Sequence, residues 1–196
     1  MTMKPFKFVA CVLLALASSA AFAHAGHGEE TMGFVAGLLH PLTGADHLAA
    51  MLAVGVWSAM TTRRVWVAPV SFAALLLIGA LMGISGVSFP AVEPMIAASL
   101  LVIGLLLATQ AKLPLLASAG LVGAFALFHG AAHGTELASA EPVAAALAGM
   151  VLGTALIHIA GLSLGRVLTQ RHVMLARLAG GAISVFGVGL LTGVVS

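Results

Sequence analysis

The stretch His40-Pro41-Leu42-Thr43-Gly44-Ala45-Asp46-His47 places two histidines and the chain's only aspartate inside an apolar segment. This segment runs approximately over residues 33–60. An ionisable side chain in the hydrocarbon region of a bilayer is unfavourable by several kcal/mol, so it usually faces a protein-lined cavity and has a function. Imidazole and carboxylate ligands together suit a divalent first-row metal. The stretch therefore indicates a membrane protein that handles metal ions.

The composition of the whole chain agrees with a membrane protein. Of its 196 residues, 61% are hydrophobic and 7% are charged, whereas a soluble domain carries about a quarter charged residues. The sequence has no stripe of basic residues that would bind nucleic acid. We therefore expect the lipid bilayer as a partner and no nucleic acid.

Residues 1–23 have the pattern of a cleavable secretory signal peptide. Two lysines precede an apolar run, and Ala21-Phe22-Ala23 is a small-residue cleavage site. An uncleaved signal anchor is the alternative interpretation. The only cysteine, Cys11, lies inside this segment, so a mature chain has no thiol for a disulfide or a thiolate metal site.

Six apolar segments are predicted to cross the membrane as helices, each close to the roughly 20 residues that this needs. After residues 33–60 they run approximately over residues 65–84, 94–110, 113–128, 143–164 and 173–195, and the fourth is expected to continue through His133. Glycine pairs four residues apart favour close helix packing, and they occur at Gly79/Gly83, Gly149/Gly153, Gly161/Gly165 and Gly189/Gly193. We therefore expect an all-α integral membrane bundle, with a signal peptide over 1–23 and one six-helix transmembrane metal-transport domain over 24–196.

Charged residues predict the orientation of this bundle. All basic residues after the signal lie in or beside the first, third and fifth connections, namely Arg63, Arg64, Lys112, Arg166, Arg171 and Arg177. The second and fourth connections hold only acidic charges, namely Glu93, Glu136 and Glu141. The positive-inside rule places the basic connections in the cytoplasm and both termini outside it. An exported N-terminus leads to the same orientation.

His40, Asp46 and His47 are the candidate metal ligands of the first segment. At a helical rise of 1.5 Å per residue, His40 is expected about 10 Å and His47 about 20 Å below the outer surface. The two histidines are seven residues apart, which predicts that they share a helix face. Asp46 is about 100° away from His47 on a regular helix. Pro41 and Gly44 are therefore expected to loosen the helix, as in the broken helices of transporter sites.

A second group of candidate ligands is His129, His133 and Glu136. The histidines are four residues apart and the glutamate is three further on, so all three project from one face of a continuous helix. His129 is expected about 24 Å from the cytoplasmic end, close to the depth of His40. Such spacing also occurs by chance, and it gains weight here because the first segment carries its own polar group.

Four further residues are weaker candidates. His158 is expected at the depth of the aspartate, either as an inner ligand or proton acceptor, or as a neutral histidine bonded to a backbone carbonyl. Glu93 is either a ligand at the outer mouth or a carboxylate favoured at a helix N-terminus. His24 and His27, with the two glutamates that follow, either capture metal loosely outside the membrane or form a solvated tail.

These motifs resemble the signatures of the HupE/UreJ family of nickel/cobalt transporters. The resemblance rests on His40-x5-Asp46-His47 with its flanks, and on Phe128-His129-Gly130-Ala131-Ala132-His133-Gly134-x-Glu136. One departure is Ala138, where a proline is expected, and it concerns the shape of the outer loop. The resemblance implies secondary uptake of Ni²⁺ or Co²⁺ across a bacterial inner membrane, with both termini periplasmic, to supply hydrogenase, urease or cobalamin synthesis.

The mechanism expected from these residues has two levels. His40, His129 and His133, with Glu136, remove water from the ion at the outer level, and Asp46, His47 and His158 hold it deeper. The sequence has no phosphate-binding Gly-x-x-x-x-Gly-Lys motif and so no ATPase of its own. The divalent ion is the transported substrate, no resident cofactor is expected, and the oligomeric state is open.

Three alternatives remain open at this stage. A membrane metalloenzyme would gather its ligands around a His-x-x-His-His element, which the sequence lacks, so we expect no enzymatic activity. A metal sensor or accessory protein would bind the ion without translocating it. A permease for Cu²⁺, Zn²⁺ or Fe²⁺ would use the same ligand types, because affinities follow one order across the first-row metals.

Overall fold

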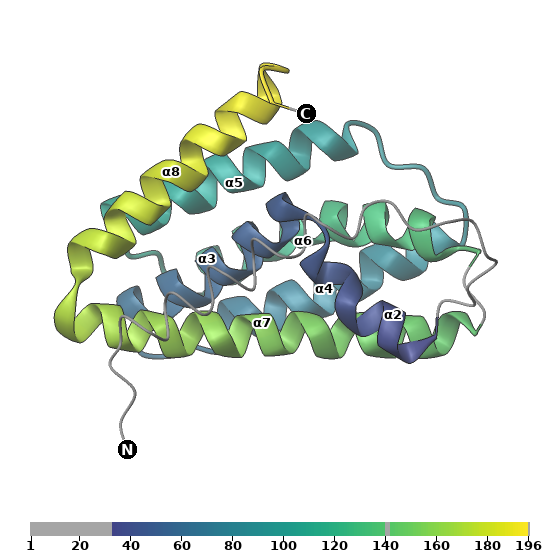
Figure 1. Cartoon of the computed structure of the whole chain (residues 1–196), viewed down its shortest axis with the longest axis horizontal. Coiled ribbons are helices and arrows are strands. Elements are labelled where there is room, and N and C mark those ends of the chain that lie inside the picture. Colours follow the sequence, from purple (N-terminus) through teal and green to yellow (C-terminus); the bar gives the residue numbers. More distant parts are fainter. Residues whose placement is uncertain (1–32, 140–141, 196) are drawn as a thin grey trace. The chain divides into compact units, whose positions relative to one another are not determined.

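The computed structural model describes residues 33–139 and 142–195, and all regular secondary structure among these residues is helical. In chain order the elements are α2 (Phe34–Leu39), the 3-10 helix η2 (His40–Leu42), α3 (Ala45–Thr61), α4 (Val67–Ile84), α5 (Val92–Thr109), α6 (Leu115–Leu137), α7 (Val143–Arg171) and α8 (Val173–Leu191) (Figure 1). The predicted signal peptide and the candidate ligands His24 and His27 lie outside the described residues.

Five helices, α4 to α8, are long and apolar enough to cross a membrane. They overlap the last five predicted segments, and α6 continues past His133 to Leu137 as the sequence predicted. Helix α7 runs to Arg171, beyond the predicted end near residue 164. Large apolar side chains on α8 are exposed, among them Met174, Leu178 and Val185, as a surface that faces lipid requires. The chain is therefore all-α and has the architecture of a multi-pass membrane protein.

The first predicted segment differs from the other five, because it is broken. Helix α2 has 6 residues, η2 has 3 and α3 has 17, so this segment is not among the helices that are long enough to cross a membrane by themselves. Pro41 lacks a backbone N–H, and Gly44 has an extended backbone at the start of α3 (φ −92°, ψ 117°). The break falls at the two residues where the sequence predicted it.

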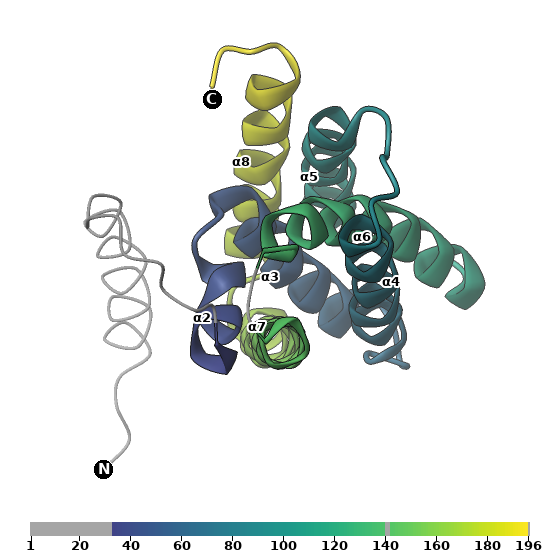
Figure 2. The ribbon, with the colours of Figure 1, turned by 90° about the vertical axis from the view of Figure 1, so that its right-hand side faces the viewer.

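Glycines bring the helix backbones into direct contact. The α carbons of Gly79 and Gly83 on α4 face backbone atoms of α6. The pair Gly149/Gly153 on α7 faces α2, and Gly161/Gly165 faces α3. These three predicted pairs are confirmed, and Figure 2 shows α7 beside α2 and α3. The fourth pair is wrong, since a side chain at Gly189 would meet Val195 of the same terminal segment and Gly193 faces open space.

The basic connections gather at one end of the bundle. The indole Nε1 of Trp57, near the end of α3, donates to the carbonyl of Ala111 at 2.9 Å. The Nε of Arg177, in the first turns of α8, donates to the carbonyl of Ala108 at 2.9 Å. The first bond joins α3 to the α5–α6 connection, which contains Lys112, and the second joins α8 to the last turn of α5. The positive-inside rule predicts that this end, with its basic residues, faces the cytoplasm.

Candidate metal centre

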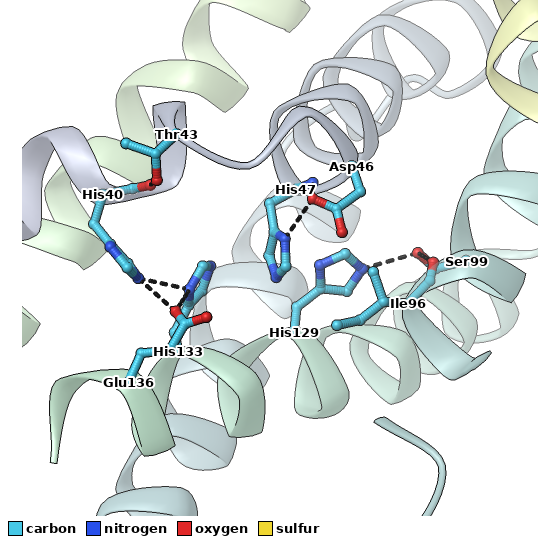
Figure 3. A network of polar contacts seen from close by, with 9 residues as sticks. All are labelled: His40, Thr43, Asp46, His47, Ile96, Ser99, His129, His133 and Glu136. Carbon is cyan, nitrogen blue, oxygen red and sulfur yellow. Dashed lines mark hydrogen bonds and ion pairs between the residues drawn. The ribbon is translucent and has the colours of Figure 1, made fainter. Parts of the chain in front are cut away.

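The broken first segment and helix α6 supply the side chains of a common polar site (Figure 3). On α6, each histidine is followed by a glycine, at positions 129–130 and 133–134. Neighbouring residues of a helix point about 100° apart. The two glycines consequently face the backbone of α4, at Leu76 and Ala80, while the two histidines point toward the start of α3. Close packing against α4 thus fixes the direction of the histidine face.

Three of the candidate ligands form a tight triangle of donor atoms. Nε2 of His40 lies 2.8 Å from Oε2 of Glu136, Nδ1 of His133 lies 3.0 Å from Nε2 of His40, and the same Nδ1 lies 3.2 Å from Oε2 of Glu136. With metal–ligand bonds of about 2.0–2.1 Å, two donors at right angles around one metal are about 3 Å apart. The triangle therefore has the dimensions of one face of a coordination sphere.

His47 extends this triangle toward His129. The ring centroid of His47 lies 4.2 Å from that of His133 and 4.5 Å from that of His129. We call these side chains the histidine cluster: His40, His47, His129, His133 and Glu136. The predicted helix face shared by His40 and His47 is wrong, because the break before α3 puts the two residues on separate elements. His47 instead lies beside His129 and His133, which the sequence assigned to a separate outer group.

Several ring nitrogens of the cluster have no partner. Among the described residues, Nε2 of His47, Nδ1 of His129 and Nε2 of His133 are buried and form no hydrogen bond. Leaving one buried polar atom unpaired costs about 1–3 kcal/mol. Three such atoms on adjacent rings form an unusual concentration of lone pairs, and a metal ion is a natural partner for them.

Asp46 contacts His47 rather than the donor triangle. Its Oδ1 accepts from the backbone N–H of His47 at 2.8 Å and lies 2.9 Å from the Nδ1 of the same residue. A carboxylate paired with an imidazole in this way orients the ring and directs its other nitrogen to a metal. In this geometry Asp46 supports the candidate ligand His47 through its Oδ1.

His158 lies outside the cluster. Its Nδ1 is 2.9 Å from the carbonyl of Thr154, which is the bond that the neutral-histidine interpretation predicts. Its Nε2 is buried and has no partner among the described residues, as an inner ligand would require. The ring of Phe72 packs against both His158 and His129, with centroid distances of 5.1 and 5.6 Å. The structure therefore joins His158 to the cluster through an aromatic ring and not by direct contact.

Glu93 is exposed and takes no part in the donor triangle. It stands in the first turn of α5 and lines a pocket of about 270 Å³, together with Ser88, Thr135 and Glu136. Glu136 is itself exposed and lines the same pocket. Both interpretations of Glu93, as an outer carboxylate and as a helix N-terminal residue, therefore fit its position.

Two neighbours of the site were not singled out from the sequence. Phe72 is fully buried on α4, and Ser99 on α5 is fully buried with its Oγ 2.8 Å from Nε2 of His129. Phe72 resembles any other apolar core residue in the sequence. Ser99 carried a usable signal, because a hydroxyl inside a predicted membrane span needs a partner.

Comparisons with known proteins agree with the motifs in this site. The family model described as HupE / UreJ protein matches residues 12–190, which include every residue of the histidine cluster. The chain belongs to the HupE/UreJ family. Protein HupE of Rhizobium leguminosarum bv. viciae is 38% identical over 182 residues, which are 92% of this chain and 95% of that protein. No solved structure matches the chain. HupE/UreJ is a family of transport and accessory proteins linked to nickel and cobalt, and not a family of enzymes.

Proposed function

We propose that the chain is a secondary permease that imports Ni²⁺, or Co²⁺, across the bacterial inner membrane and so supplies hydrogenase, urease or cobalamin synthesis. The observation that carries this proposal is the histidine cluster. Four imidazoles and one carboxylate lie in continuous contact within an apolar helix bundle, and three of their buried nitrogens have no partner within the described residues. A packing role needs no such arrangement.

The proposed path begins at the pocket that Glu93 and Glu136 line. Their charges attract a hydrated cation, after the N-terminal histidines His24 and His27 have concentrated it outside. Glu136 belongs to both the pocket and the donor triangle, so the ion exchanges its water there for imidazole. His47 and His129 are the next ligands, and Asp46 orients the first of them.

From the cluster the proposed path continues toward the basic end of the bundle. His158 is the next group with a free nitrogen, and the ring of Phe72 stands beside it. The membrane potential supplies the driving force, because each inward charge gains about 2.3 kcal/mol per 100 mV. Two charges gain about 4.6 kcal/mol, which corresponds to more than about a thousandfold accumulation at 1.4 kcal/mol per decade.

Uptake of radioactive ⁶³Ni²⁺ into cells that express the full chain tests this function. His47→Ala and His129→Ala remove cluster ligands, and His172→Ala is the matched control, because His172 is exposed between α7 and α8. We expect both cluster variants to lose uptake, the control to retain it, and Co²⁺ to compete with Ni²⁺. Uptake that persists in both cluster variants would reduce these histidines to packing residues.

A metal-binding sensor or accessory protein is the second candidate, since the same cluster would hold an ion without releasing it. Purified protein in proteoliposomes separates the two functions. A permease carries ⁶³Ni²⁺ into the lumen, whereas a sensor binds it in proportion to the protein and accumulates none. Inhibition by Zn²⁺ or Cu²⁺ that greatly exceeds inhibition by Co²⁺ would indicate a permease for another divalent metal.

A further inference from the structure

The hydroxyl of Ser99 makes two short contacts but has only one proton. Its Oγ lies 2.6 Å from the carbonyl oxygen of Ile96 and 2.8 Å from Nε2 of His129. All three residues appear in Figure 3, where the second ring nitrogen of His129 lies on the side of His47. Both Ser99 and His129 are fully buried, so these contacts determine where each proton resides.

The carbonyl contact decides the direction of both bonds. A carbonyl oxygen has no proton, so a 2.6 Å contact with Oγ is favourable only when Ser99 donates to Ile96. Oγ then offers a lone pair to His129, and Nε2 of that ring must carry the proton. In a neutral imidazole the other nitrogen, Nδ1, is then the acceptor. This is the nitrogen that is buried without a partner among the described residues.

We propose that Ser99 is a positioning residue that holds His129 in its Nε2–H tautomer and thereby presents the Nδ1 lone pair to the metal. This inference rests on the proposed function, since it names a residue that prepares a ligand of the same cluster. Ser99 contacts Nε2 of His129, not Nδ1, so it acts on the metal only through the His129 ring.

Two other buried histidines are held in the same way. Nδ1 of His47 faces the carboxylate of Asp46 at 2.9 Å, and Nδ1 of His158 faces the carbonyl of Thr154 at 2.9 Å. Neither oxygen carries a proton, so each ring donates from Nδ1, and its Nε2 is the nitrogen without a partner. A carboxylate, a carbonyl or a hydroxyl oxygen thus determines in each ring which nitrogen is left without a proton.

Loss of the hydroxyl leaves a buried N–H of His129 without an acceptor. The ring then gains by moving its proton to Nδ1, which faces the cluster, and this change removes the lone pair from the cluster. Removing such an outer partner of a metal-bound histidine lowers affinity by about 10–100-fold. We expect Ser99→Ala to weaken Ni²⁺ binding by this factor and Ser99→Thr, which keeps a hydroxyl, to restore much of it.

The test uses the metal-free full chain, labelled with ¹⁵N-histidine and purified in detergent. The His129 signals are identified by their absence in His129→Gln, and their shifts report which ring nitrogen is protonated. We expect the Nε2–H form in the wild type, a changed or mixed form in Ser99→Ala and the wild-type form in Ser118→Ala. Ser118 is the matched control, because it is buried on α6 and its Oγ also donates to a carbonyl three residues earlier.

The outcomes separate this proposal from the proposed function. An Nδ1–H tautomer in wild-type protein, or an unchanged tautomer in Ser99→Ala, overturns the role of Ser99 whether or not the chain transports metal. Equal Ni²⁺ affinities of wild-type and Ser99→Ala protein, measured by isothermal titration, also overturn it. If Ser99→Ala does not fold, the wild-type spectrum alone still decides the tautomer. Absence of transport with the expected tautomer and affinity would refute the permease and leave Ser99 in its role.

Discussion

The histidine cluster and His158 are two buried imidazole regions with different surroundings. In the cluster, each ring lies beside another ring, with centroid distances of 4.2 to 4.7 Å. His158 is at 2% exposure, between His129 and His133 of the cluster, but its neighbours are the ring of Phe72 and a backbone carbonyl. Burial alone therefore does not distinguish a candidate metal site from a packed histidine. The convergence of several donor atoms distinguishes the cluster from His158.

This difference assigns different work to the two regions in the proposed permease. Several donors from the cluster can bind one ion at once, so the cluster determines affinity. His158 offers one nitrogen, so it affects how fast an ion moves on from the cluster. The following predictions test this division of roles.

Replacing His133 is expected to have the largest effect, because its ring contacts both His40 and His47, and its Nδ1 contacts Glu136. Uptake of ⁶³Ni²⁺ by His133→Ala should fall by more than about 100-fold, since loss of only an outer partner of a ligand already costs about 10–100-fold. Initial rates are compared at equal amounts of protein in the membrane. A near-normal rate would show that the cluster is not on the path.

Gly79→Ala tests whether helix packing positions the cluster. The added methyl group would collide with the carbonyl of Leu127 on α6, and overpacking of this kind costs about 1–3 kcal/mol. A lower unfolding temperature in detergent and weaker Ni²⁺ binding are expected. Gly120→Ala on the exposed face of α6 is the control, because nothing lies within 4 Å of the added carbon. An unfolding temperature of Gly79→Ala equal to that of the wild type would contradict the role of the close α4–α6 contact.

The two carboxylates of the pocket should differ in importance. Glu136→Gln removes a charge from the donor triangle, and hydrogen bonds to a charged group contribute about 1.5–3 kcal/mol. We therefore expect uptake to fall by about 10–100-fold. Glu93→Gln should lower it by about fivefold or less, because Glu93 lies outside the donor triangle, and a solvated charge of this kind contributes at most about 1 kcal/mol. Equal losses in uptake measurements would mean that the ion binds in the pocket and not in the triangle.

His158→Ala should have the smallest effect on binding. We expect Ni²⁺ affinity, measured by titration of purified protein, to stay close to that of the wild type. The uptake rate should fall by about tenfold, the equivalent of 1.4 kcal/mol. His129→Ala is the comparison, because it should lower both quantities. A large loss of affinity in His158→Ala would place this residue among the ligands and remove the distinction between the two regions.

Helix positions and ligand types could be predicted from the sequence, because hydropathy and spacing are local properties. The approximate positions of α4 to α8, the break near Pro41 and the common face of His129 and His133 all followed from them. The contact of His47 with His129 and His133 did not, since counting along a helix assumes that the helix is continuous. Ser99 and Phe72 were missed as neighbours of His129, because contacts between separate helices depend on packing that no single segment encodes.

X-ray absorption at the nickel edge is the most direct test of the histidine cluster as the metal site. The full chain with His24→Ala and His27→Ala removes the N-terminal histidines as a source of signal. The cluster predicts imidazole scattering from at least two histidines around one bound Ni²⁺, and a loss of this scattering in the same protein with His129→Ala and His133→Ala. A shell of oxygen ligands without imidazole, or a spectrum that these two further substitutions leave unchanged, would contradict it.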